Sequence, residues 1–283
     1  MGYSSYSADD RNTRAVAGSY STKTATELFA SSFNSIMSPF GVGVRESRDS
    51  ETHPQSFPVI IALDVTGSML RIPEYLVKEG LPNIVSSIIQ KGFNDPQIMF
   101  IAIGDHECDA YPLQISQFES GDKELDYWLM NTYLEAGGGG NLGESYLLAW
   151  YFAAHHTETD SFVKRGKKGL LITIGDEPCL QNIPGSALKN IFGEGQYSRN
   201  NSASELYQKA SEKWNCFHIH VMETNSGSRQ FVMDGWKQMI GDNLLISGKH
   251  TGISDIIVDL TLSLSGSSPS TNPTQEIKED EML

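Results

Sequence analysis

The chain has 283 residues, of which 39% are hydrophobic and 20% are charged, and its formal net charge is −14. This negative balance argues against nucleic acid and anionic membrane as partners, because binding to phosphate groups needs clustered Lys and Arg. No apolar stretch approaches the roughly 18 residues of a membrane span, and the N-terminus lacks the basic and apolar regions of a signal peptide. The three cysteines are scattered, which argues against a disulfide framework. We therefore expect a cytoplasmic protein.

Composition divides the chain into three parts. Residues 1–56 are rich in Ser, Tyr and Thr with weak periodicity, and only 26–37 has helical character, so we expect a partly ordered N-terminal arm. Residues 57–265 carry the apolar patterning of one folded domain. From residue 266 the chain is rich in Ser, Pro and Asn and ends in an acidic run, which predicts a disordered acidic tail.

Strands and helices alternate within residues 57–265. The predicted strands are 59–64, 97–104, 169–175, 216–222 and 243–247, with an antiparallel edge strand at 111–117. The predicted helices are 74–91 with a kink at Pro82, 122–134, 143–155 and two more that begin at the capping residues Ser202 and Ser254. This alternation predicts an α/β fold: a Rossmann-like, doubly wound, mostly parallel six-stranded sheet with helices on both faces and one antiparallel edge strand.

The end of the first strand carries three oxygen-bearing side chains at alternate positions, Asp64, Thr66 and Ser68. Gly67 permits the turn that would let these side chains converge. Buried parallel strands end where open α/β folds bind ligands. One carboxylate with two hydroxyls suits Mg²⁺, which keeps several waters and takes only one or two carboxylates. The alternative is that these residues form only a polar turn that caps the next helix.

Two further strands end in acidic residues, at Asp105 and at Asp176. In a doubly wound sheet these carboxyl ends share one rim. Two carboxylates at ~4 Å repel by about 4 kcal/mol at an effective dielectric near 20, so a cation between them would convert repulsion into binding. The glycines at 137–140, followed by Asn141 and Glu144, lack the Gly-Lys-Ser/Thr of a phosphate-binding loop. We interpret them as a loop passing close over a metal, the alternative being a flexible linker.

With these segments in this order, residues 57–264 resemble the von Willebrand factor A-domain family. The hallmark of that family, the metal-ion-dependent adhesion site, has Asp-x-Ser-x-Ser after the first strand, a Thr in a second loop and an Asp after the fourth strand. Asp64, Thr66 and Ser68 match the first element in a variant of the intracellular branch, and Asp176 matches the last. Where the usual Thr would stand, the chain has Gly140, which offers no side-chain oxygen.

Some family members carry Gly-Gly-Gly-Asp-x-Pro-Glu-Ser in the second loop, and Gly-Gly-Asn141-Leu-Gly-Glu144-Ser145 is similar to it. The resemblance implies a site for Mg²⁺, or for Mn²⁺ or Ca²⁺, that is weaker or more hydrated than one with all five ligands. The expected metal ligands are Asp64, Thr66, Ser68, Asn141 and Asp176, with Asp105, His106 and Glu144 beside the metal or at the partner's surface.

The resemblance also implies a function. In this family a carboxylate of a partner protein usually completes the metal coordination, so the expected role is an adaptor or scaffold module and not an enzyme. By the same analogy the partner is an AAA+ ATPase or a larger assembly. The alternative is a Mg²⁺-dependent phosphohydrolase. Enzymes of the haloacid dehalogenase type begin with Asp-x-Asp-x-Thr, and their second Asp acts as general acid. This chain has Thr66 at that position, and a threonine cannot act as a general acid at neutral pH, which disfavours the alternative. His218 and His220 share one strand face, and we interpret them as structural.

Overall fold

The computed structural model describes residues 4–69, 71–93, 96–135 and 141–265, except the side chains of Ser68 and Ser265. Within these ranges six strands form the central sheet, in the order β10–β9–β6–β2–β3–β4. All neighbours pair in parallel except β3 and β4. The predicted fold class is therefore confirmed. The strands are β2 (Phe57–Asp64), β3 (Pro96–Ile103), β4 (Leu113–Ile115), β6 (Gly169–Gly175), β9 (Trp214–Val221) and β10 (Leu244–Ser247).

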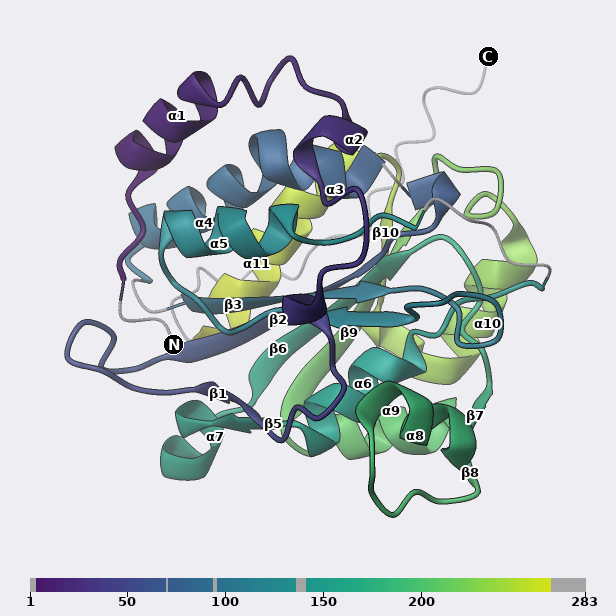
Figure 1. Ribbon diagram of the computed structural model, residues 1–283. Coiled ribbons are helices and arrows are strands. Elements are labelled where there is room, and N and C mark those ends of the chain that lie inside the picture. The colour runs from purple at the N-terminus through teal and green to yellow at the C-terminus, as the bar shows by residue number, and fades with distance from the viewer. Residues whose placement is uncertain (1–3, 70, 94–95, 136–140, 266–283) are drawn as a thin grey trace.

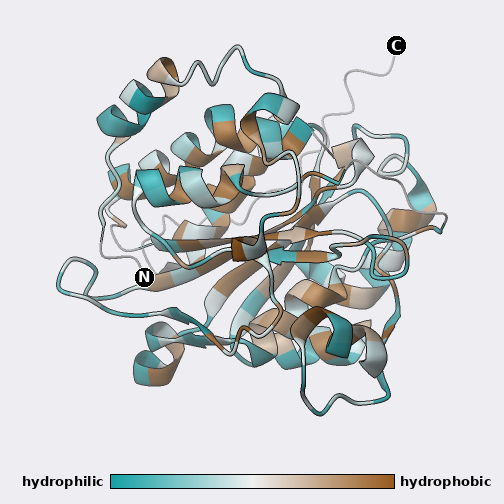
Figure 2. Cartoon of the chain, in the orientation of Figure 1, coloured by the Kyte–Doolittle hydropathy of each residue, from teal (hydrophilic) through white to brown (hydrophobic). Residues whose placement is uncertain are grey.

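Helices cover both faces of the sheet, and the two layers are seen above and below it in Figure 1. Alternate β2 residues point to opposite faces, so Ile61 joins one core cluster and Ile60 the other. The first layer contains α3 (Arg71–Tyr75), the π-helical segment η3 (Leu76–Gly80), α4 (Leu81–Gln90), α5 (Asp122–Met130) and α11 (Ile253–Ser265). The second contains α6 (Leu147–His155), α8 (Gly185–Phe192), α9 (Ala203–Ser211) and α10 (Gln230–Ile240). Figure 2 shows the strands as largely hydrophobic, as expected for a sheet buried on both faces.

Short elements complete the chain. They are α1 (Ala8–Ala17), α2 (Ala25–Leu28), α7 (Asp160–Arg165), strands β1 (Arg45–Ser47), β5 (Thr157–Thr159), β7 (Asn182–Pro184) and β8 (Asn200–Ser202), and 3₁₀ turns η1 (Ser35–Met37), η2 (Gly67–Met69), η4 (Gly241–Asn243) and η5 (His250–Gly252). The helical character expected at 26–37 is thus confined to its two ends. None of the helices in the described ranges combines the length and the apolar character required to cross a bilayer.

Two helix starts were predicted from capping residues, and one prediction was wrong. Ser202 caps α9 as expected, because its hydroxyl accepts from the backbone N–H of Glu205 and the Glu205 carboxylate accepts from that of Ser202. Ser254 is not a cap, because α11 already begins at Ile253. Its hydroxyl lies 2.8 Å from the Tyr75 hydroxyl and so serves the packing of α11 against α3.

The N-terminal arm packs along the domain. Arg14 of α1 forms ion pairs with Asp122 and Asp126 of α5, at 2.8 and 2.9 Å. The arm then passes the β4 edge of the sheet, where the backbone of Ala30 bridges to that of Tyr133, and reaches the opposite layer, where β1 pairs with β5. Figure 1 shows this path from α2 down to β1. The tail predicted for 266–283 lies outside the described residues.

Candidate functional site

The sheet brings the predicted acidic residues to one rim. β2 lies between β3 and β6, and Leu63 pairs with Ile174 across the β2–β6 boundary. Asp64 therefore ends β2 beside Asp176, which follows β6, while Asp105 follows β3 on the other side. The strand order reverses at β2, and doubly wound sheets bind ligands at such a switch point, outside the carboxyl ends of the strands.

Asp64 is held by hydrogen bonds at both carboxylate oxygens. Its Oδ1 accepts from the backbone N–H of Thr66 at 2.9 Å and from the Thr66 hydroxyl at 2.6 Å. Its Oδ2 accepts from the Tyr146 hydroxyl at 2.9 Å. Asp64 and Tyr146 are fully buried, and Thr66 is 6% exposed. The Thr66 hydroxyl directs its proton to Asp64, so its lone pairs are available to another ligand. The polar turn considered from the sequence is therefore present as well.

Tyr146 is the site residue that the sequence analysis missed. Its ring packs edge-on against His218 and Trp236, each at 5.2 Å between ring centroids. Gly175 makes the approach possible, because a Cβ there would lie 1.8 Å from the Tyr146 hydroxyl oxygen. The available signal was a tyrosine in an otherwise apolar helical segment, since a buried phenol needs a hydrogen-bond partner.

The two histidines of β9 have structural contacts. His218 stacks on Trp236 at 3.5 Å, and its Nδ1 lies 2.9 Å from the Thr173 hydroxyl. His220 Nε2 lies 2.8 Å from the carbonyl oxygen of Gly227. These contacts fix the wall of the site behind Tyr146.

Two loops meet over the rim. The Ser145 hydroxyl accepts from the backbone N–H of His106 at 2.9 Å and lies 2.8 Å from His106 Nδ1. The Asn141 amide donates to the Glu107 carboxylate at 2.8 Å. Asp105 is buried, and its Oδ1 accepts from the backbone N–H of Glu107. The loop after β3 and the loop before α6 are thus joined directly.

The rim concentrates like charges in a buried place. Burial, and then the Asp176 carboxylate, raise the pKa of Asp64. Burial, and then the charges of Asp64, Asp109, Asp105 and Glu177, raise the pKa of Glu144. No three Asp, Glu, His or Cys side chains in the described ranges are already grouped around one ion position. The oxygen donors nevertheless fit a hydrated Mg²⁺, which needs few direct carboxylates, and buried carboxylate oxygens of Asp105 and Glu144 lack hydrogen-bond partners within the described residues.

The structure thus brings most of the predicted site residues to one rim. These are Asp64, Thr66, Asp105, His106, Glu144 and Asp176, whereas Asn141 is drawn toward Glu107. Ser68 lies in η2, and its side chain is outside the described part of the structure, as are the glycines 137–140.

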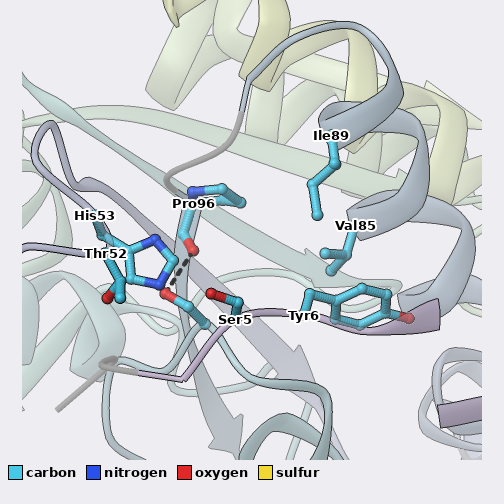
Figure 3. A pocket seen from close by; sticks show the side chains of 8 residues that line it. Ser5, Tyr6, Thr52, His53, Val85, Ile89 and Pro96 are labelled. Carbon is cyan, nitrogen blue, oxygen red and sulfur yellow. Dashed lines mark hydrogen bonds between the residues drawn. The ribbon is translucent and has the colours of Figure 1, made fainter. Parts of the chain in front are cut away.

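A separate cavity of about 200 Å³ lies at the opposite, amino end of the strands. Figure 3 shows it between the arm residues Ser5 and Tyr6, the α4 residues Val85 and Ile89, and Pro96 at the start of β3. Its lining holds no carboxylate, so it has nothing in common with the acidic rim.

Comparisons with known proteins bear on the fold. No family model matches the sequence, and no curated protein matches it. The structure is similar to the open conformation of the pilus adhesin SpaC from Lactobacillus rhamnosus GG, with a TM-score of 0.52 and 9% identity over 77% of this chain and 31% of the adhesin. At that identity the similarity establishes the fold alone, and this chain spans less than a third of the adhesin's length.

Two other matches are more distant. A further crystal form of SpaC has a TM-score of 0.49 at 10% identity, covering 77% of this chain and 31% of that one. Proximal thread matrix protein 1 from the mussel byssus has a TM-score of 0.43 at 10% identity, covering 78% of this chain and 49% of that one.

Proposed function

We propose that residues 57–265 form a von Willebrand factor A-like module that binds a protein partner through a divalent metal, without catalysing a reaction. Mg²⁺, or Mn²⁺ or Ca²⁺ in its place, would be held by Asp64, Thr66, Ser68, Asn141 and Asp176. The bound ion would supply a Lewis-acidic point at which a carboxylate of the partner completes the coordination. The observation that carries the proposal is the juxtaposition of Asp64 and Asp176 at the switch point, with the Thr66 hydroxyl fixed on Asp64.

The physical support for the proposal is the electrostatic repulsion between the carboxylates of the rim when no cation is bound. Buried carboxylates that repel one another destabilise a fold, and a cation reverses the sign of their contribution. The negative net charge argues against nucleic acid or membrane as the partner. By family analogy we propose a protein partner in the cytoplasm, either an AAA+ ATPase or a larger assembly.

Thermal unfolding at increasing Mg²⁺ concentration tests the metal site. An ion that binds only the folded state stabilises it by about 2.7 kcal/mol at a concentration 100-fold above its dissociation constant. We expect this response in the wild type and its loss in Asp64→Ala, whereas Asp234→Asn, which removes one negative charge from an exposed position on α10, should retain it. A melting temperature that is independent of divalent ions would contradict the proposal.

Partner binding is tested separately. Proteins that the wild type retains in Mg²⁺ but not in EDTA, and that Asp176→Ala does not retain, would be the expected partners. Robust hydrolysis of phosphomonoesters that is lost in Asp64→Ala would instead identify a phosphohydrolase.

A further inference from the structure

The loop before α6 buries a carboxyl group that has no basic partner within the described residues. Glu144 is 6% exposed, and its Oε2 has no hydrogen-bond partner within the described residues. The backbone leaves little freedom here. The Glu144 N–H donates to the carbonyl of Pro178 at 2.9 Å, and its carbonyl accepts from the N–H of Leu180 at 3.0 Å. These two backbone hydrogen bonds fix the position of the Glu144 backbone and so the point from which its side chain extends.

The conformation of this loop requires glycine at position 143. Its φ of +130° is disfavoured for residues with a side chain, and a Cβ there would lie 2.9 Å from the carbonyl oxygen of Pro178. Only glycine lets the chain press against the loop after β6 at this point. Glu144 therefore lies at the rim, between the loop after β6 and the loop after β3.

The charges that act most strongly on Glu144 are all negative. They come from Asp64, Asp105, Asp109 and Glu177. An apolar side chain would cost nothing at a buried position of this kind, whereas an unpaired carboxylate among other carboxylates is strongly unfavourable. Burial among these charges is tolerated only if the Glu144 carboxyl group holds a proton or a cation joins the cluster, and a cation would balance the surrounding carboxylates as well.

We propose that Glu144 is the protein carboxylate that coordinates the divalent ion directly, with the Asp64 and Asp176 carboxylates acting through metal-bound water. This inference rests on the proposed function. Asp64 is less suited to direct coordination because its Oδ1 already accepts two hydrogen bonds and its Oδ2 one, which leaves a single lone pair for an ion. Mg²⁺ accepts one or two carboxylates and keeps several waters, and this assignment agrees with the absence, in the described ranges, of three acidic side chains around one point. The chain then holds its ion before any partner arrives.

The test uses Mn²⁺, which shares the preference of Mg²⁺ for oxygen ligands and can be followed by water-proton relaxation. Calorimetry gives the affinity, and relaxation gives the number of waters on the bound ion. Glu144→Gln should weaken Mn²⁺ binding by about tenfold or more and leave an additional water on any ion that still binds. Asp234→Asn is the control, because it removes the same charge from an exposed position on α10 that contacts none of the proposed ligands, and it should change the affinity by less than about twofold.

The outcomes separate this inference from the proposed function. Wild-type affinity and an unchanged water number in Glu144→Gln would overturn the role of Glu144 while leaving the metal site in place. No Mn²⁺ binding by the wild type would overturn both. Circular dichroism verifies that Glu144→Gln is folded, and Glu144→Asp provides a second variant. Because Glu144→Asp keeps the charge but shortens the reach, it should also bind Mn²⁺ more weakly if coordination is direct, and as tightly as the wild type if only the charge matters.

Discussion

The hydroxyl of Tyr146 is the contact on which the arrangement of Asp64 most depends. Replacing Tyr146 with Phe removes the donor to Asp64 Oδ2 and leaves the ring in place against His218 and Trp236. No cavity of appreciable size is created, so the effect on stability should come from the lost hydrogen bond alone. Both partners are fully buried, which prevents water from replacing the missing donor.

The magnitude follows from the chemistry of the pair. A hydrogen bond to a charged group contributes about 1.5–3 kcal/mol, and a buried oxygen left without a donor bears the full desolvation penalty. A neutral hydrogen bond contributes only about 0.5–1.5 kcal/mol. The Tyr207 hydroxyl donates to the carbonyl of Cys216 at 3.0 Å and accepts from the Asn243 amide at 2.7 Å. Both partners are neutral and Tyr207 is only half-buried, so water can replace the lost bonds and Tyr207→Phe provides a neutral comparison in the same domain.

Urea unfolding followed by circular dichroism measures both variants at pH ~9, above the raised pKa of Asp64, so that the acceptor is charged. We expect Tyr146→Phe to lower the free energy of unfolding by about 2 kcal/mol, and by more than Tyr207→Phe does. In Asp64→Asn the same Tyr146→Phe change should cost less, because the acceptor is no longer charged. A Tyr146→Phe loss smaller than that of Tyr207→Phe, or equal losses in both Asp64 backgrounds, would refute the reasoning.

Two further predictions concern the N-terminal arm. Arg11 is 3% exposed and Asp126 is its ion-pair partner, so Asp126→Ala should cost about 3–5 kcal/mol in urea unfolding by leaving the buried guanidinium without a carboxylate. Against the opposing effect of burial, hydrogen bonds from groups such as Arg165 lower the pKa of Asp49 to about 2. Asp49→Asn should therefore cost about 1–2 kcal/mol at pH 7, and the difference from wild type should shrink below pH ~4, where the lowered pKa makes wild-type stability fall with pH. A gap that does not narrow would contradict this linkage.

The sheet could be predicted from the sequence because its strands are fully buried. Runs of β-branched residues such as 59–63 carry their own signal, and acidic residues mark where the strands end. The start of α11 could not be predicted from its apparent cap. Ser254 has the chemistry of a capping residue, but contacts with Tyr75 and Gly80, more than 170 positions away in the chain, place it inside the helix.

The arm shows a different limit of sequence reasoning. α1 has few apolar residues, and its arginines taken alone predict a solvent-exposed surface. Its stability comes instead from α5, where Asp122 and Asp126 receive Arg14 more than 100 positions later in the chain. Charge pairs of this kind have no local signature, because either partner alone looks like an exposed residue.

At the candidate site the local part was predictable and the distant part was not. The spacing of Asp64 and Thr66 encodes a turn that the chain forms by itself, whereas Tyr146 reaches Asp64 only because Gly175 leaves room between β6 and α6. Elsewhere in the described structure, buried charged residues such as Arg11 and Asp160 have ion-pair partners. The rim differs, because it buries Asp64 and Glu144 among other carboxylates. Such local conflict in an otherwise consistent fold is expected where function, rather than stability, determines the residues.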